Sequence, residues 1–292
     1  MLRVGIVGAE SNHSESFSVA INVEKRIRGV RVTHIWGEKT SQARQRAVAG
    51  EIPRVVKHPE DMIGEIDGVV IAPCHPKDHL PAARPFLEAR VPLFIDKALC
   101  YRVTEGRCFL ARAAELSVPV GLGSVIPMQP AFLALQKKVR RLGKIRMVVS
   151  TGPSDIRSKH GGLYFYAVHQ VESVLRLLGY DVSHAQVFKG TAGNHVAALA
   201  YTDGAVVTMN MIRDAAASFF HMSVIGEKGR VDHTTQGMPY HDTMYLPGIR
   251  YFVKLFRTGR SEETVETMLG PVAVLQALEK SIARRARVKV SF

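Results

Sequence analysis

The stretch that decides the fold is VGIVGAESNHSESF, residues 4–17. It opens with apolar, β-branched residues, as a buried strand does, and reaches Gly8 where a strand would turn into a helix. In the dinucleotide fingerprint G-x-G-x-x-G, further glycines follow at the second and fifth positions after the first. This sequence has Glu10 and His13 there instead. It therefore predicts the strand–turn–helix unit of a nucleotide-binding fold, with an altered phosphate turn.

The altered turn keeps features that suit a phosphate. It still leads into a helix N-terminus, where free N–H groups favour anions. Ser11, Asn12 and Ser14 can cap that helix and donate hydrogen bonds to phosphate oxygens. Glu10 would be unfavourable beside a phosphate if its side chain pointed inward. We expect the turn to hold a dinucleotide, with His13 as an additional polar residue.

Outward from this stretch, the first 122 residues alternate short apolar runs with amphipathic helical patterns. The expected strands are 2–8, 29–36, 68–73, 91–99 and 118–123, and the expected helices are 14–27, 41–49, 59–66, 78–90 and 104–116. Strand–helix–strand units at this spacing form right-handed crossovers and a parallel, doubly wound sheet. Nearly continuous apolar strands indicate a sheet with helices on both faces. Residues 1–122 are therefore predicted to be a Rossmann-type domain.

The pattern of expected strands and helices changes after this domain. Helices are expected at 130–142, 163–179, 246–256 and 270–284, and strands at 144–152, 185–190, 195–212, 218–226 and 229–235. The run 195–212 is predicted to be a hairpin that turns at Asp203–Gly204, a dipeptide suited to a type I′ turn. Residues 123–292 are thus predicted to be an α+β domain on a largely antiparallel, open sheet. The final helix, 270–285, is a candidate to pack back on the first domain.

The composition excludes several classes of protein. The 292 residues are 46% hydrophobic and 22% charged, as in a globular protein. No apolar run approaches the roughly 20 residues that cross a bilayer, and the N-terminus lacks a signal-peptide pattern. Three cysteines without C-x-x-C spacing argue against disulfides and zinc. His75 and His79 have helical ligand spacing, but Pro76 lies between them and no third ligand is near. We expect no metal and a cytoplasmic location.

The net charge of +13 raises the question of a nucleic-acid partner. Two basic stretches, residues 137–146 and 283–289, have no aromatic residues between their cations and no nucleic-acid motif around them. They are typical of solvated helix ends, so a nucleic-acid partner is not expected. A positive field does raise the local concentration of anionic ligands.

Several pieces of the chain, in their order and spacing, resemble the Gfo/Idh/MocA oxidoreductases, the family of glucose–fructose oxidoreductase and inositol dehydrogenase. These pieces are Ala72–Pro73, His79 with Asp96 17 residues later, PAF at 130–132, GGLYFYAVHQVESVLRLLG at 161–179, and VLQALEKSIARRARVKV at 274–290. The resemblance implies a dinucleotide-binding domain followed by an α/β domain whose open sheet often forms the oligomer interface. It also implies hydride transfer between NAD or NADP and a carbon bearing a hydroxyl group.

The resemblance also implies site residues. Lys97 matches the family's lysine and Asp96 stands for its glutamate, while His169 matches its catalytic histidine and Glu172 stands for the aspartate one turn later. Lysine and histidine beside a reacting hydroxyl suit proton transfer. The predicted catalytic residues are Lys97 and His169. The predicted substrate-binding residues are Asp96, Glu172 and Phe165. The predicted cofactor residues are Gly8, Ser11, Asn12, His13, Gly37, Glu38, Pro73, His79 and Lys97.

The chain departs from the family pattern at positions that matter. Phe165 stands where the family has an aspartate, four residues before its histidine. The second strand normally ends in an acid that binds the ribose, and Gly37 stands there. Glu38 could reach the ribose instead, and Lys39 could accept a 2′-phosphate. The sequence therefore leaves the choice between NAD and NADP open.

Two functions are compatible with these features. The first is an NAD(P)-dependent oxidoreductase acting on a small sugar, polyol or related metabolite, assembled as a homodimer or homotetramer through the sheet of residues 123–292. The second is a non-catalytic descendant of the family that binds a nucleotide or metabolite as a sensor or partner protein.

Overall fold

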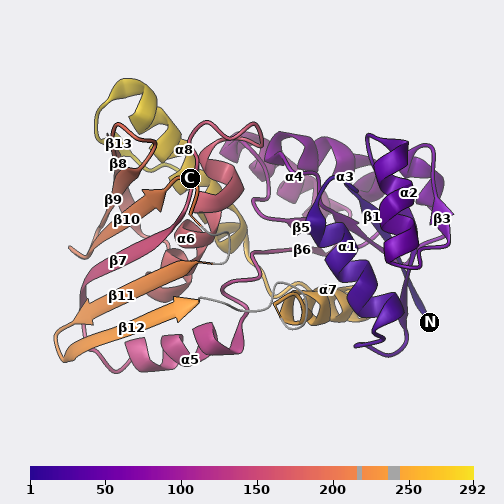
Figure 1. Ribbon diagram of the computed structural model, residues 1–292, viewed down its shortest axis with the longest axis horizontal. Helices are drawn as coiled ribbons and strands as arrows, with labels where there is room; N and C mark the ends of the chain where they lie inside the picture. Colours follow the sequence, from indigo (N-terminus) through magenta and orange to yellow (C-terminus); the bar gives the residue numbers. More distant parts are fainter. Residues whose placement is uncertain (216–218, 236–243) are drawn as a thin grey trace. The chain divides into compact units, whose positions relative to one another are not determined.

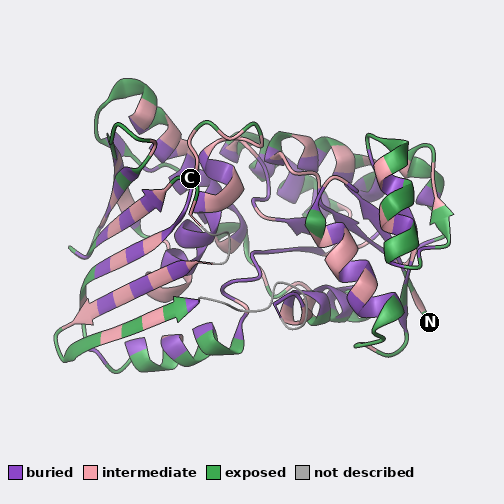
Figure 2. Ribbon diagram, in the orientation of Figure 1, coloured by how far each residue is buried: buried purple, intermediate pink, exposed green. Residues whose placement is uncertain are grey.

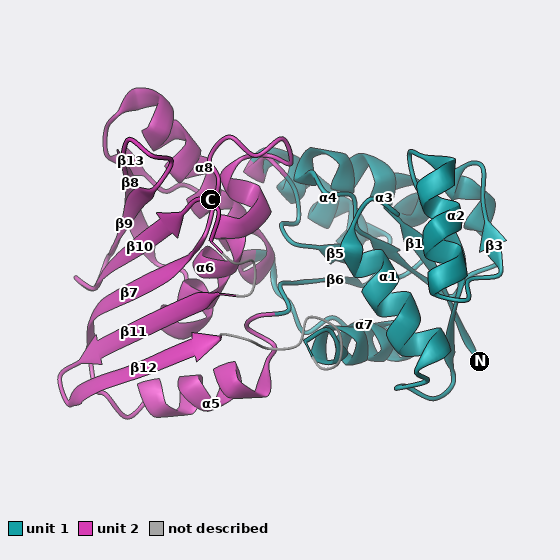
Figure 3. Ribbon diagram, in the orientation of Figure 1, with its two compact units in different colours: residues 1–100, 104–125, 241–265 teal, residues 101–103, 126–240, 266–292 magenta. Residues whose placement is uncertain are grey.

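The computed structural model describes residues 1–215, 219–235 and 244–292 (Figure 1). The chain forms two compact units (Figure 3). The first unit consists of residues 1–100, 104–125 and 241–265, and the second of residues 101–103, 126–240 and 266–292. The chain thus returns to the first unit after the second sheet. The sequence-based domain limits at residues 122 and 123 stay a prediction.

The first unit is built on a six-stranded parallel sheet of order β3-β2-β1-β4-β5-β6. Its strands are β1 (Leu2–Val7), β2 (Val30–Trp36), β3 (Arg54–Val55), β4 (Gly68–Ile71), β5 (Leu93–Asp96) and β6 (Val120–Gly123). The predicted doubly wound sheet is therefore confirmed. The strand order reverses between β1 and β4, and ligands bind such sheets beyond the carboxyl ends of the strands at this switch point.

Helices on this sheet follow most of the predicted patterns. They are α1 (Asn12–Ser18), which continues as the π-helical segment η1 (Val19–Val23), α2 (Thr40–Ala49), α3 (His79–Glu88), α4 (Val103–Glu115) and α7 (Leu246–Thr258). Two short 3-10 turns, η2 (Pro59–Met62) and η3 (Pro76–Asp78), complete the set. The predicted helix 59–66 is wrong beyond η2, because Ile63 is already extended and Gly64 has φ +85°.

The second unit is built on a seven-stranded sheet of order β12-β11-β7-β10-β9-β8-β13. Its strands are β7 (Ile145–Pro153), β8 (Val182–Lys189), β9 (His195–Tyr201), β10 (Val206–Ile212), β11 (Phe220–Gly226), β12 (Gly229–Thr235) and β13 (Val288–Lys289). Only β7 and β10 pair in parallel among these strands, so the predicted largely antiparallel sheet is confirmed.

Helices cover one face of this second sheet. They are α5 (Pro130–Val139), which packs against β12, α6 (Leu163–Leu178), which packs against β7 and β10, and α8 (Val265–Arg284). Figure 2 shows the resulting alternation of buried and more exposed residues along the strands. Across the described ranges, no helix is both long enough and apolar enough to cross a membrane.

The β9–β10 hairpin forms as predicted, but its turn is not type I′. A type I′ turn needs positive φ at both central residues, and only Gly204, with φ +93°, is positive in this turn. The N–H of Gly204 donates to the carbonyl of Tyr201 at 3.2 Å. Asp203 accepts a hydrogen bond from the N–H of Ala205 through its side chain at 3.0 Å. That local side-chain contact favours the observed turn over the mirror-image one.

Candidate active site

The turn after β1 keeps the first glycine of the fingerprint for a steric reason. Gly8 has φ +117°, and a Cβ there would lie 2.5 Å from the backbone of Ala72 and Pro73 at the end of β4. Ser14 donates to the Gly8 carbonyl at 2.6 Å. Ser11 caps α1 by accepting a hydrogen bond from the N–H of His13 at 3.1 Å. The strand–turn–helix geometry therefore persists without the later glycines.

Glu10 points toward the end of β2. Its carboxylate accepts a hydrogen bond from the backbone N–H of Glu38. A Cβ on Gly37 would lie 2.6 Å from the Ala9 Cβ and 2.9 Å from the Glu10 Oε1. Gly37 is thus required because the turn lies against it. The carboxylate beside this strand end comes from the turn, a placement that sequence reasoning missed and that the Gly37 position could have signalled.

Three predicted residues meet at the end of β5. The Asp96 Oδ2 lies 2.9 Å from the His13 Nδ1 and 3.2 Å from the Lys97 Nζ. The Asp96 side chain is only 3% exposed, against 12% for His13 and 11% for Lys97. Tyr245, which sequence reasoning missed, packs its ring edge-on against His13 at 5.1 Å between centroids. His13, at the position of the third fingerprint glycine, therefore joins the phosphate turn to Asp96.

This arrangement fixes the charge of Asp96. Burial raises the pKa of its carboxyl group, but the positive charges of His13 and Lys97 and the short contact with His13 outweigh burial. The pKa of Asp96 is therefore held well below its usual range. An ionised Asp96 can only accept hydrogen bonds, so it orients the donors around it.

His79 links the ends of two strands from a fully buried position. Its Nε2 lies 2.8 Å from the carbonyl oxygen of Pro73, after β4, and its Nδ1 lies 2.7 Å from that of Ala98, after Lys97. Burial lowers the pKa of the His79 ring. With no exposed surface, His79 is placed to position the neighbouring loops.

His169 lies in the second unit, in a row of aromatic rings. Its side of α6 is buried, and its ring packs edge-on against Phe220 of β11 at 5.6 Å between centroids. Tyr166, one turn earlier, is 6.3 Å away. Phe165 packs against His160 at 4.7 Å and against Tyr166 at 4.7 Å. Helical spacing could have pointed to Tyr166, but Phe220 comes from a distant strand and left no signal in the sequence.

Glu172 follows His169 by three residues on the same helix and is 3% exposed. Its Oε1 lies 3.7 Å from the Nη2 of Arg176, one turn further along α6. Residues three and four apart share a helix face. The helix thus presents a histidine, a carboxylate and a guanidinium in order along one side.

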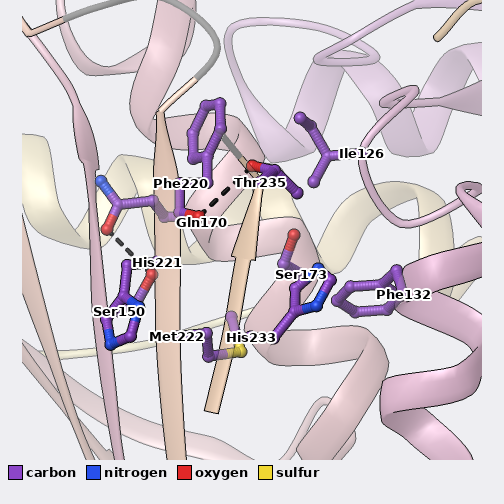
Figure 4. A pocket seen from close by; sticks show the side chains of 10 residues that line it. All are labelled: Ile126, Phe132, Ser150, Gln170, Ser173, Phe220, His221, Met222, His233 and Thr235. Carbon is purple, nitrogen blue, oxygen red and sulfur yellow. Dashed lines mark hydrogen bonds between the residues drawn. The ribbon is translucent and has the colours of Figure 1, made fainter. Parts of the chain in front are cut away.

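A small cavity lies beside α6 (Figure 4). Gln170 borders it and accepts a hydrogen bond from the Ser150 hydroxyl at 3.0 Å. Phe132 of α5, Phe220 and His233 also line it. Its volume of about 20 Å³ has room for a single water molecule, so it cannot hold a sugar. No group of three or more potential metal ligands occurs among the residues that the structure describes.

Comparison with known proteins agrees with the fold. Residues 2–124 match the family model GFO_IDH_MocA, described as an oxidoreductase family with an NAD-binding Rossmann fold. The chain matches none of the curated proteins.

Solved structures are similar over the whole length. The myo-inositol 2-dehydrogenase of Lactobacillus plantarum is 18% identical with a TM-score of 0.87, covering 99% of each chain. The scyllo-inositol dehydrogenase of Lactobacillus casei, with bound NAD(H) and scyllo-inositol, is 15% identical with a TM-score of 0.86, also covering 99% of each chain. At these identities the likeness shows a shared fold. The match of residues 2–124 to this family model agrees with the resemblance to the Gfo/Idh/MocA oxidoreductases seen in the sequence.

Proposed function

We propose that this protein transfers a hydride between a nicotinamide dinucleotide and a hydroxyl or keto carbon of a small sugar, polyol or related metabolite. The observation that carries the proposal is the contact of Asp96 with both His13 and Lys97. This contact brings a lysine ammonium, an ionised carboxylate and a residue of the phosphate turn together at the end of β5. Inositol dehydrogenases have the same fold, which supports polyols as the class of substrate.

The residues of the first unit fit a dinucleotide. Gly8 leaves no room for a Cβ between the turn and the end of β4, so the turn keeps the tight path that the first glycine of the fingerprint provides. Ser11 and Asn12 lie at the start of α1, and the Glu10 carboxylate lies at the end of β2, where a ribose hydroxyl needs an acceptor. Gly8, Ser11, Asn12 and Glu10 would therefore hold the cofactor.

The residues of this chain would handle the proton. A bound nicotinamide supplies the hydride chemistry itself. Lys97 would donate a hydrogen bond from its Nζ to the reacting oxygen, and Asp96 would hold that ammonium in place. His169 would accept or return the proton of the hydroxyl group, because imidazole titrates near neutral pH.

Glu10 leads to a prediction about cofactor choice. We expect NADH to bind about tenfold more tightly than NADPH, because a carboxylate at the end of β2 accepts a hydrogen bond from the ribose 2′-hydroxyl and repels a 2′-phosphate. Fluorescence titration with both cofactors measures the difference. Glu10→Gln keeps an acceptor for the Glu38 N–H and should reduce the difference in affinity between NADH and NADPH. The control is Glu60→Gln on the exposed turn η2, which should leave this difference unchanged. Equal wild-type affinities for the two cofactors would contradict this assignment.

Phe165 favours one alternative function. It packs against the rings of His160 and Tyr166, so an apolar side chain stands where the family has a polar partner of its histidine. A metabolite sensor that binds NADH without turnover would fit this change. A panel of polyols and keto sugars assayed with NAD and NADH separates the two functions, since tight cofactor binding without turnover of any of them favours the sensor.

We further propose that the protein is a homo-oligomer joined through the open face of the second sheet. Met147 pairs with Val206, and Phe188 pairs with Val196, so these four side chains lie on the face opposite α6. They are 38–54% exposed, so two pairs of large apolar side chains on this face are open to a partner.

The open face can be tested directly. Phe188→Asp should shift the protein from oligomer to monomer in light scattering, because the charge would be buried against a partner. Val48→Asp on α2 of the first unit is the control, since Val48 is 82% exposed and lies on another surface. A wild-type protein that is monomeric at all concentrations would rule the interface out.

A further inference from the structure

A second polar cavity occurs in the second unit, at one end of its sheet. Three segments line it: residues 155–157 after β7, the β8–β9 hairpin with residues 189–193 and 195, and Arg213 after β10. The volume is about 230 Å³. That is below the roughly 300–1,000 Å³ of a site for a drug-sized ligand, so the cavity suits a small molecule. Its lining includes none of the residues placed in the proposed active site.

The lining is strongly basic. Arg157, Lys189 and Arg213 face a single acidic lining residue, Asp155. Within the described ranges, the side chains of Arg157 and Lys189 form no ion pair. In the part of the chain that the structure describes, Arg213 has an ion-pair contact with Asp214, whose Oδ2 lies 3.7 Å from the Arg213 Nε and which is 88% exposed. The cations of this cavity are therefore largely uncompensated by the protein.

The β8–β9 hairpin contacts both the backbone and the side chain of Arg213. The Asn194 Oδ1 accepts a hydrogen bond from the backbone N–H of Arg213 at 2.9 Å. Gly193 has φ +83°, and a Cβ there would lie 2.5 Å from the Arg213 Cδ. Glycine at position 193 therefore leaves room for the Arg213 side chain beside the hairpin.

His195 also lines the cavity. Its Nδ1 accepts a hydrogen bond from the N–H of Gly190 at 3.2 Å, which leaves the proton of the neutral ring on Nε2. Burial, followed by the charge of Lys189, lowers the pKa of His195. The ring is therefore neutral at pH 7 and adds an N–H donor to the three cations.

From this geometry we infer that the cavity binds a small, multiply charged anion, such as a phosphate ester or a polycarboxylate metabolite. Arginine and lysine are the side chains that bind phosphate and carboxylate groups, and charge-assisted hydrogen bonds to them are the strong ones. A concave cavity of this size fits a compact metabolite better than an extended polymer.

Isothermal titration of the full chain tests the inference. The probes are inorganic phosphate, glycerol 3-phosphate and citrate, with glycerol as the neutral control. We expect the anions to bind, more weakly as NaCl is raised, and glycerol not to bind. A preference for glycerol 3-phosphate or for citrate identifies the source of the anion. Failure of all three anions to bind, or equal binding of glycerol, would overturn the inference.

Variants locate the site. Arg157→Gln and Lys189→Gln should each weaken anion binding by roughly five- to tenfold, the effect of removing one charged donor. Asp155→Asn should tighten it, because it removes the only acidic lining residue and keeps the Oδ1 that accepts from the Arg157 N–H. Arg141→Gln, on an exposed arginine after α5, is the matched control.

The proposals for the two sites can be tested independently of each other. All four variants should retain wild-type NADH binding, because none lies in the first unit. Anion binding that Arg157→Gln and Lys189→Gln leave unchanged would place the anion elsewhere, for instance at the phosphate turn, and would overturn this inference without touching the proposed oxidoreductase activity.

Discussion

Replacing Lys97 with Met is expected to lower kcat by roughly 10²–10⁴ while NADH binding changes little. Methionine keeps the length of the side chain but removes the ammonium that Asp96 holds at 3.2 Å. The substrate oxygen would then lose its hydrogen-bond donor during proton transfer. The measurement is steady-state turnover of the best substrate in the polyol panel, with NADH titration as the separate binding readout.

His169→Asn should reduce turnover to a similar degree, because asparagine keeps a polar group but cannot carry a proton near neutral pH. Lys77→Met, on the exposed turn η3, is the control and should turn over substrate like the wild type. Full activity in the Lys97 and His169 variants would end the assignment of this pair. Loss of NADH binding in Lys97→Met would instead assign Lys97 to the cofactor.

Replacing Asp96 with Asn is expected to destabilise the protein by about 3 kcal/mol at pH 7, since it leaves the largely buried ammonium of Lys97 without its carboxylate. The pKa of Asp96 is lower in the folded protein than in the unfolded chain, where it is about 3.9. Its stabilising effect is therefore fully present above pH ~4 and is lost as the pH falls toward the folded pKa. Urea unfolding of both proteins between pH 7 and pH 3 measures the difference.

The pH dependence separates an ionised Asp96 from one that is merely well packed. The difference in unfolding free energy between wild type and Asp96→Asn should stay constant from pH 7 to about pH 5 and shrink below pH ~4. Asp181→Asn, an exposed carboxylate of the second unit, should cost little at any pH. A difference that disappears between pH 7 and pH 5 would show that the Asp96 carboxyl titrates near neutrality, contrary to the geometry.

Most strands and helices could be predicted because their signals are local. The apolar runs around Val4, Val70 and Phe94 are buried strands, as predicted. The errors occurred where a local signal was short or ambiguous. Strand β3 has two residues and pairs only with β2, so its sequence carries no periodicity. The dipeptide Asp203–Gly204 predicted a type I′ turn. The Asp203 side chain instead accepts a hydrogen bond from the N–H of Ala205, which stabilises a different turn.

The sequence by itself determined the parallel sheet, the altered phosphate turn and the order of the polar residues. Each of these follows from local patterns, namely the alternation of strands with helices and the residue types at a turn. Only the tertiary structure decided that Glu10 faces the end of β2, that His13 contacts Asp96, and that Arg157, Lys189 and Arg213 line one cavity. These residues lie on segments far apart in the chain. Their contacts arise from the packing of strand ends against loops, which leaves no periodic pattern in the sequence.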